Sequence, residues 1–99
     1  MPGVARINDT CSTGHGCDST STVIGPSTNV FINLRGAERK GDPVAPHTIL
    51  VGDDCVSHSA VINVGSSSVF VNGIALARLG DSTDSGVITS ASSNVTAGG

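Results

Sequence analysis

One stretch of this 99-residue chain decides its fold: Val69-Phe70-Val71-Asn72-Gly73-Ile74-Ala75-Leu76-Ala77-Arg78-Leu79-Gly80-Asp81. The β-branched and aromatic residues at 69–71 predict a short strand, and the apolar run at 74–77 predicts its return. Asn72-Gly73 is a strong hairpin signal because both positions accept a positive φ angle. Gly80-Asp81 ends the unit, so the stretch predicts a β-hairpin followed by a turn.

An earlier copy of this unit reads Val30-Phe31-Ile32-Asn33-Leu34-Arg35-Gly36-Ala37-Glu38-Arg39-Lys40-Gly41-Asp42. In this copy we expect Arg35-Gly36 to form the turn. A fragment of the unit opens the chain at 5–9, and another closes it at 94–99. The chain is therefore interpreted as a repeat protein in which each unit buries its apolar face against its neighbours.

The composition favours an all-β domain of short hairpins that needs extra stabilisation. Only 37% of the residues are hydrophobic, and the chain has two Phe, no Tyr and no Trp. Large aromatic side chains carry much of the burial energy of small cores, so a disulfide or a metal ion is expected to supplement this core. The apolar β-branched runs argue against disorder in spite of the 13 glycines.

The charge and the chain start exclude several classes of protein. The net charge is −3 with five Lys and Arg, which gives no electrostatic footprint for nucleic acid or anionic lipid. No apolar run approaches the roughly 20 residues of a membrane span. The start Met1-Pro2-Gly3-Val4 lacks the regions of a signal peptide. We therefore expect synthesis in a cytoplasm without a signal peptide.

The histidines and cysteines suggest a metal site. All six lie in two polar segments, 10–28 and 43–59, which we interpret as loops. They are Cys11, His15, Cys17, His47, Cys55 and His58. Zinc prefers four tetrahedral N or S ligands, and Cys55-x-x-His58 has ligand-like spacing. The set His15, His47, Cys55 and His58 would complete such a site.

Three alternatives remain open at this stage. Cys11 or Cys17 could replace Cys55 as the sulfur ligand, or these two could pair as a disulfide, which a reducing cytoplasm disfavours. The loop histidines could also simply be solvated. A sulfur with three imidazoles suits zinc, with iron as the alternative ion.

Each repeat also carries an arginine with an aspartate three residues later: Arg6 and Asp9, Arg39 and Asp42, Arg78 and Asp81. We expect an Arg–Asp pair inside each repeat that holds the hairpin to the following segment. The alternative is that the arginines contact a partner protein or lipid.

The elements Ala37-x-Arg39-x-Gly41-Asp42 and Ala75-x-Ala77-Arg78-x-Gly80-Asp81 resemble the PAAR-repeat family over nearly the whole chain. The resemblance implies a small cone-shaped domain of short β-hairpins with pseudo-threefold repeats. It also implies a non-enzymatic tip on a trimeric β-helical spike, one tip per trimer, in contractile phage tails or type VI secretion systems, where the spike pierces a target-cell membrane.

In that family His and Cys side chains hold a metal ion near the vertex, which here implies His15, His47 and His58 with Cys55. The third segment departs from the pattern because Ser85-Gly86 stands where a ligand is expected. Residues 1–99 are expected to form a single PAAR-repeat domain with no extension domain, located in a virion tail or secreted with a type VI apparatus.

Two other functions compete with the spike tip. One is a free-standing, zinc-stapled β-repeat module for binding or adhesion, which would not associate with a trimeric spike. The other is a hydrolase that uses residues such as Asp54, His58 and Ser59. No nucleophile-elbow or paired-carboxylate signature supports the hydrolase.

Overall fold

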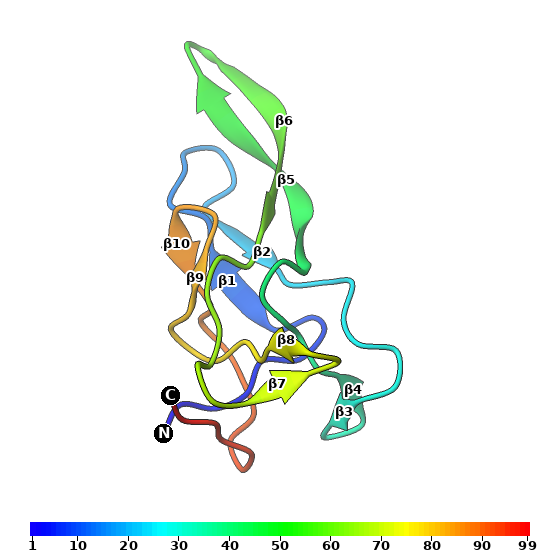
Figure 1. The fold of residues 1–99 in the computed structure, drawn as a ribbon. Helices are drawn as coiled ribbons and strands as arrows, with labels where there is room; N and C mark the ends of the chain where they lie inside the picture. The colour runs from blue at the N-terminus through cyan, green and yellow to red at the C-terminus, as the bar shows by residue number, and fades with distance from the viewer.

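The computed structural model describes residues 1–99 as ten short strands connected by turns (Figure 1). The strands are β1 Thr10–Ser12, β2 Thr20–Thr22, β3 Phe31–Ile32, β4 Arg35–Gly36, β5 Pro43–Val51, β6 Asp54–Val61, β7 Phe70–Val71, β8 Ile74–Ala75, β9 Ser82–Thr83 and β10 Gly86–Val87. They form five separate antiparallel pairs, which confirms the all-β prediction. The chain contains no helix with the length and apolar character needed to cross a bilayer. The molecule is elongated, with extents of 42 × 24 × 21 Å.

Two of the hairpins lie at the wide end of the molecule, and both follow the repeat. In β7–β8 the turn is Asn72-Gly73, with φ angles of 54° and 75°, as the sequence predicts. In β3–β4 the turn is Asn33-Leu34, with φ angles of 54° and 65°. The expected turn at Arg35-Gly36 is therefore wrong, and these two residues form β4. The reason is that Asn33 takes the place of Asn72 and, like it, accepts the left-handed conformation.

The third unit of the wide end is assembled from the two chain termini. The amide of Val4 donates to the carbonyl of Val95 at 2.9 Å, and the amide of Ala97 donates to the carbonyl of Pro2 at 3.0 Å. In the other two units, the bonds equivalent to the one between Val4 and Val95 run from Ala37 to Val30 and from Leu76 to Val69. The two ends of the chain therefore lie side by side (Figure 1).

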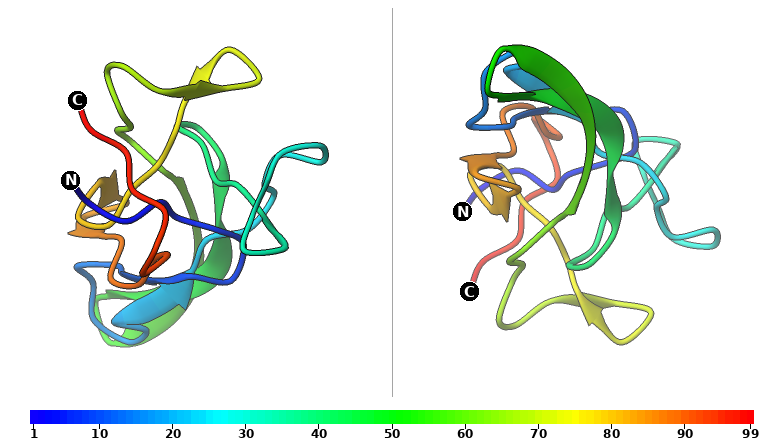
Figure 2. Two further views of the ribbon diagram at one scale, coloured as in Figure 1. Left: turned by 90° about the horizontal axis from the view of Figure 1, so that it is seen from below. Right: turned by 90° about the horizontal axis from the view of Figure 1, so that it is seen from above.

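A ring of backbone hydrogen bonds joins the three units around one axis. Glu38 donates to Ala5 at 3.1 Å, Ala5 donates to Ala77 at 2.9 Å, and Ala77 donates to Glu38 at 2.9 Å. These three residues precede the three repeat arginines. Seen along the long axis, β3–β4 and β7–β8 extend outward in different directions from this centre (Figure 2). One chain thus forms a closed, approximately threefold ring.

Three further hairpins form a second layer towards the narrow end: β1–β2, β5–β6 and β9–β10. Isolated bridges connect them cyclically through Cys11↔Ile88, Val23↔Val44 and Ile62↔Thr83. The main core lies between the two layers and consists of Ala5, Cys11, Val23, Val44, Ile62, Ala77 and Ile88. The segment 43–59, expected to be a loop, is therefore almost entirely the hairpin β5–β6, and the segment 10–28, also expected to be a loop, contains the short pair β1–β2. The longest hairpin, β5–β6, projects from the narrow end (Figure 1).

The expected Arg–Asp pairs are formed in all three repeats. The Nε atoms of Arg6 and Arg39 donate to Asp9 and Asp42 at 3.0 and 2.8 Å, and the second guanidinium contact makes each pair bidentate. The Arg78–Asp81 pair has the same geometry. Each aspartate also accepts its arginine's backbone amide. Such paired, bidentate bonds are the strong class of ionic hydrogen bond, so they fix each turn.

Glu38 breaks the symmetry of the ring, because the equivalent residues are Ala5 and Ala77. Its side chain is fully buried, and neither carboxyl oxygen has a hydrogen-bond partner. Burial and the neighbouring Asp42 raise its pKa to about 9, although Arg39 opposes the shift. A carboxyl group with this pKa is protonated and neutral at pH 7.

Candidate metal site

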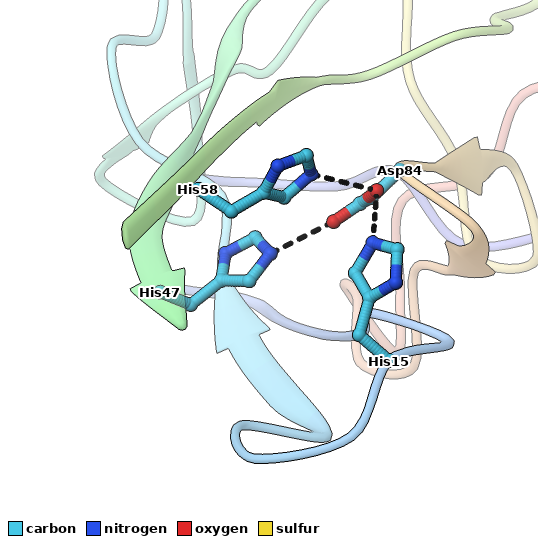
Figure 3. Close-up of side chains that lie close together, drawn as sticks. All are labelled: His15, His47, His58 and Asp84. Carbon is cyan, nitrogen blue, oxygen red and sulfur yellow. Dashed lines mark hydrogen bonds and ion pairs between the residues drawn. The ribbon is translucent and has the colours of Figure 1, made fainter. Parts of the chain in front are cut away.

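A cluster of three histidines and one aspartate lies between the second-layer hairpins (Figure 3). The three His Nε2 atoms converge on the Asp84 carboxylate. His15 and His58 lie 2.7 and 3.2 Å from Oδ1, and His47 lies 2.8 Å from Oδ2. The four candidate ligand atoms all lie within 4.8 Å of one another. The structure thus brings together the three histidines that the sequence suggested.

His47 and His58 meet because they face each other across β5 and β6. They are direct cross-strand partners in the register. An irregularity between Val44 and His47 adds one residue to β5 relative to β6. A bulge of this kind redirects the side chains that follow it. Without the extra residue, His47 would not be the cross-strand partner of His58.

His15 comes from a compact segment between β1 and β2. The hydroxyl of the buried Thr13 accepts the amide of His15 at 3.2 Å and donates to the carbonyl of Asp18 at 2.7 Å. The amide of Thr13 also donates to the carbonyl of Ser19 at 3.0 Å. This internal bonding holds the segment in one shape, so it presents His15 in a fixed place.

Asp84 lies in the turn between β9 and β10. Its φ angle is 56°, a left-handed conformation that Asp adopts more readily than most residues. Burial acts to raise the pKa of Asp84, but hydrogen bonds from His15, His47 and His58 outweigh that effect and lower the pKa below its ordinary value. The carboxylate is therefore ionised and supplies the negative charge of the cluster.

The hydrogen-bond pattern of His47 shows that the cluster suits a cation. Its Nδ1 lies 2.9 Å from the Ala45 carbonyl oxygen, which can only accept, so Nδ1 carries the hydrogen. In neutral His47 the lone pair of Nε2 then faces the Asp84 oxygen. Two acceptors at this distance repel each other unless a proton or a cation lies between them. Fixing the tautomer through the other ring nitrogen is also a common feature of metal-binding histidines.

The donor set and its exposure fit a structural metal ion. Three imidazole nitrogens and one carboxylate oxygen are normal zinc ligands, and four protein ligands leave no open position for a substrate. The side chains of His47 and Asp84 are nearly buried, at 3% and 7% exposed, whereas those of His15 and His58 are partly exposed. An ion held here would connect β5–β6, the β9–β10 turn and the segment that carries His15.

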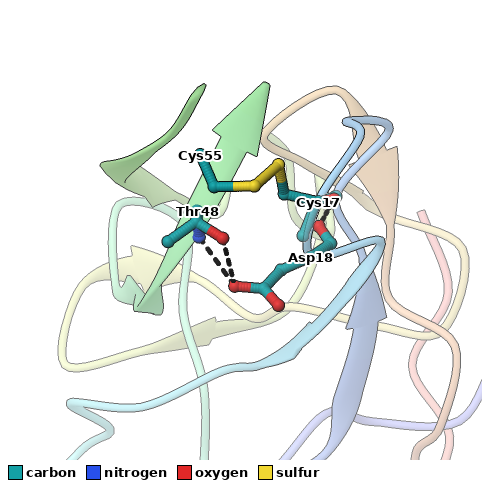
Figure 4. Close-up of a disulfide and its surroundings, with 5 residues drawn as sticks. Cys17, Asp18, Thr48 and Cys55 are labelled. Carbon is teal, nitrogen blue, oxygen red and sulfur yellow. Dashed lines mark hydrogen bonds between the residues drawn. A yellow bond between two sulfur atoms is a disulfide. The ribbon is translucent and has the colours of Figure 1, made fainter. Parts of the chain in front are cut away.

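Cys55 does not lie in this cluster, contrary to the sequence interpretation. Its sulfur is bonded to Cys17 in a disulfide (Figure 4). The physical reason is strand geometry. Successive side chains of a strand point to opposite faces, so Cys55, three residues before His58 on β6, faces away from it. The C-x-x-H spacing would bring both side chains together on a turn, but not on a strand.

The other two cysteines also differ from the alternatives considered. Cys17 pairs with Cys55 and not with Cys11. Cys11 is a free, buried thiol in the core, where burial raises its pKa above the ordinary value. Its surroundings are the apolar residues between the two layers. No sulfur therefore accompanies the three histidines.

Asp84 is the residue that sequence reasoning missed, because only His and Cys were considered as ligands. A signal for it was present. Each of the three Asp residues that end a repeat unit, Asp9, Asp42 and Asp81, is followed within six residues by a member of the cluster: His15, His47 and Asp84. The third segment thus has a candidate ligand one residue before Ser85-Gly86, the point at which the sequence departs from the family pattern.

Comparison with known families agrees with the geometry. The PAAR motif model matches residues 13–86, which is about three quarters of the chain. No curated protein sequence matches the chain significantly. The matched span includes two complete repeat units and all four residues of the cluster. The chain therefore belongs to the PAAR-motif family, whose members are structural, non-enzymatic tips that cap the spikes of type VI secretion systems and contractile phage tails.

Proposed function

We propose that this chain caps a trimeric β-helical spike, with one chain per trimer, and sharpens it for passage through a target-cell membrane. The observation that carries the proposal is the backbone ring of Ala5, Glu38 and Ala77, which gives a single chain approximate threefold symmetry. A single chain that meets three identical subunits needs three similar faces. The ring supplies them.

The wide end has the character of a docking surface. Phe31 on β3 and Phe70 on β7 are the only aromatic residues of the chain, and they are 59% and 57% exposed. They occupy equivalent positions in two repeats. Leu34, in the β3–β4 turn, is 96% exposed. Aromatic side chains are enriched at the centres of protein interfaces, so these residues are the proposed contacts with the spike.

The narrow end needs rigidity that its core does not provide. We propose that His15, His47, His58 and Asp84 hold one structural ion there, with zinc first and iron as the alternative. When bound, the ion would hold together segments that share few apolar contacts. A structural zinc can contribute on the order of 10 kcal/mol to folding. Asp84 takes the place that the sequence interpretation gave to Cys55.

The proposed location follows from the same role. The protein would travel on the spike, either in a virion tail or with a type VI apparatus. It would meet the target membrane only transiently. No nucleic acid is involved, in keeping with the net charge of −3.

Association with a spike tests the main proposal. The protein is mixed with the trimeric spike encoded beside it, and the complex is analysed by native mass spectrometry. One chain per trimer is expected. Phe31→Asp and Phe70→Asp should abolish the complex, because each places a charge in an apolar contact. Val56→Asp on β6, at the other end, is the matched control and should bind normally. Absence of any complex would favour the free-standing binding module.

Elemental analysis tests the metal site separately. The purified protein should carry about one equivalent of metal. Asp84→Asn and His47→Ala should lose it, and Cys55→Ser should keep it under non-reducing conditions with excess metal. A Cys55→Ser variant that lost the metal while Asp84→Asn retained it would restore the ligand set first expected from the sequence.

A further inference from the structure

The outer part of the β5–β6 hairpin is attached to the rest of the molecule by very few contacts. From residue 50 to residue 57 every side chain is exposed, including Leu50 and Val51 at the end of β5. This part therefore has almost no core of its own. An isolated two-stranded hairpin is at best marginally stable in water. The position of this outer part therefore depends on its few contacts with the rest of the protein.

Residues 16–18, which precede β2, make the contacts that hold the outer part of the hairpin. Both the amide and the hydroxyl of Thr48 on β5 donate to the Asp18 carboxylate at 2.8 Å, and the Asp18 amide donates back to Thr48 at 3.2 Å (Figure 4). The disulfide between Cys17 and Cys55 adds a covalent bond to the facing strand β6. These contacts are close together, so the segment works as a single clamp on the hairpin.

The clamp is adjacent in sequence to the candidate ligands. Cys17 follows His15 by two residues, and Cys55 precedes His58 by three. Cys17 also has a φ angle of 67°, which is uncommon for a residue with a side chain. In this conformation the sulfur of Cys17 is bonded to Cys55 on the hairpin. The disulfide thus lies within three residues of each of the two histidines whose side chains are the most exposed of the cluster.

We propose that Cys17 and Cys55 form a redox-sensitive latch that fixes the projecting hairpin and, through it, the His15–His58 side of the cluster. In a reducing compartment both residues are thiols, and the clamp on the outer part of the hairpin then consists of the Thr48–Asp18 bonds only. Two-step exchange with a low-molecular-weight disulfide closes the latch: the protein dithiol gives up two electrons, and the disulfide leaves as two thiols. The hairpin becomes rigid when the protein enters an oxidising environment.

The latch itself does not depend on the spike. Its effect on metal retention rests on the proposed function, whereas its effect on the hairpin does not. The two are separated by working first with metal-free protein and without any spike. Binding to the spike uses the opposite end of the molecule, so it should be the same for the oxidised and the reduced protein.

Hydrogen–deuterium exchange of the metal-free protein is the primary test. Oxidised protein is compared with protein reduced by a phosphine, and with Cys17→Ser and Cys55→Ser. Opening the latch should raise exchange at residues 48–57 about tenfold, which corresponds to about 1.4 kcal/mol of local stability. Exchange in β3–β4 and β7–β8 should not change. Cys11→Ala removes a thiol outside the disulfide and is the matched control.

Two further measurements make the result decisive. Thiol titration of the unfolded protein should find one free thiol after oxidation and three after reduction. The metal-loaded protein should release its ion to a chelator faster when the latch is open. Three free thiols after treatment with a disulfide, or equal exchange at residues 48–57 in both redox states, would overturn the proposal. If a Ser variant fails to fold, the comparison of oxidised and reduced wild-type protein decides alone.

Discussion

The buried carboxyl group of Glu38 makes the stability of the ring depend on pH. In the unfolded chain this group has an ordinary pKa near 4.5, and in the fold the pKa is about 9. Between these values the folded protein retains a proton that the unfolded chain has lost. Stability is therefore highest below pH 4.5, as far as this group is concerned, and it decreases as the pH rises towards 9.

The size of the effect follows from the shift. Each unit of pH within this window lowers the free energy of unfolding by about 1.4 kcal/mol. At pH 7, about two and a half units above the unfolded pKa, the cost is about 3 kcal/mol, which is a large part of the total stability of a small domain. Glu38→Met keeps a similar volume and has neither a titrating group nor unpaired oxygens. It should be more stable than the wild type at pH 7 and above.

Urea denaturation at several pH values, with metal removed, measures this difference. The free energy of unfolding of Glu38→Met minus that of the wild type should grow by about 4 kcal/mol between pH 5.5 and pH 8.5. Titration of all other groups is common to both proteins and cancels. Glu38→Gln keeps the shape of the side chain but does not titrate. Its difference in free energy of unfolding from the wild type should therefore rise with pH at the same rate, but from a lower value at pH 5.5. A difference that stays flat across this range would mean that the folded protein holds Glu38 ionised, and the reasoning would fail.

Three further predictions concern the pairs, the metal and the disulfide. Arg39→Ala leaves Asp42 buried without its partner and should lower the free energy of unfolding by about 3 kcal/mol in urea denaturation. Arg35 is more exposed, and the control Arg35→Ala should lower the free energy of unfolding by less than about 1 kcal/mol. Equal losses of stability in the two variants would contradict a structural role for the Arg–Asp pairs. Removal of the metal by a chelator should lower the melting temperature of the wild type but not of Asp84→Asn, as followed by circular dichroism. Reduction of the Cys17–Cys55 bond, which closes a loop of 38 residues, should cost about 4 kcal/mol in the chain-entropy treatment; an unchanged denaturation midpoint would contradict it.

The repeat made part of the fold predictable. Because Asn72-Gly73 is a strong turn signal, the β7–β8 hairpin followed directly from the sequence. The earlier copy of the unit located β3–β4, although its turn was expected two residues too late. The arginines and aspartates also recur at fixed spacing, so their pairing could be expected. What these features share is that a short stretch of sequence determines each of them.

The second layer was harder to foresee because its strands are polar. β1 and β2 consist of Thr, Ser and Cys, and the outer half of β5–β6 is exposed on both faces. Such strands lack the alternation of apolar and polar residues that normally reveals a strand. They form because each hairpin bridges its neighbours around the axis, which is a tertiary effect.

The same limit explains the errors at the candidate site. The histidines were identified by residue type, but the roles of Cys55 and Asp84 depend on which face of a strand or turn each residue occupies. The extra residue in β5 sets the His47↔His58 register, and no spacing rule shows it. Cys17 and Cys55 are 38 residues apart in the sequence, and they likewise come into contact only in the folded protein.

The unit formed by residues 2–4 and 95–97 delays the completion of the ring during synthesis. Val4 is made early, but its partner Val95 lies 91 residues further along the chain. Contacts this distant in sequence carry a high entropic cost of closure and form slowly. The two complete hairpins can form while synthesis continues, whereas the wide end gains its third face only after residues 95–97 have been made. Until then the ring has an open seam, and a trimeric partner would find the full docking surface only once that seam has closed.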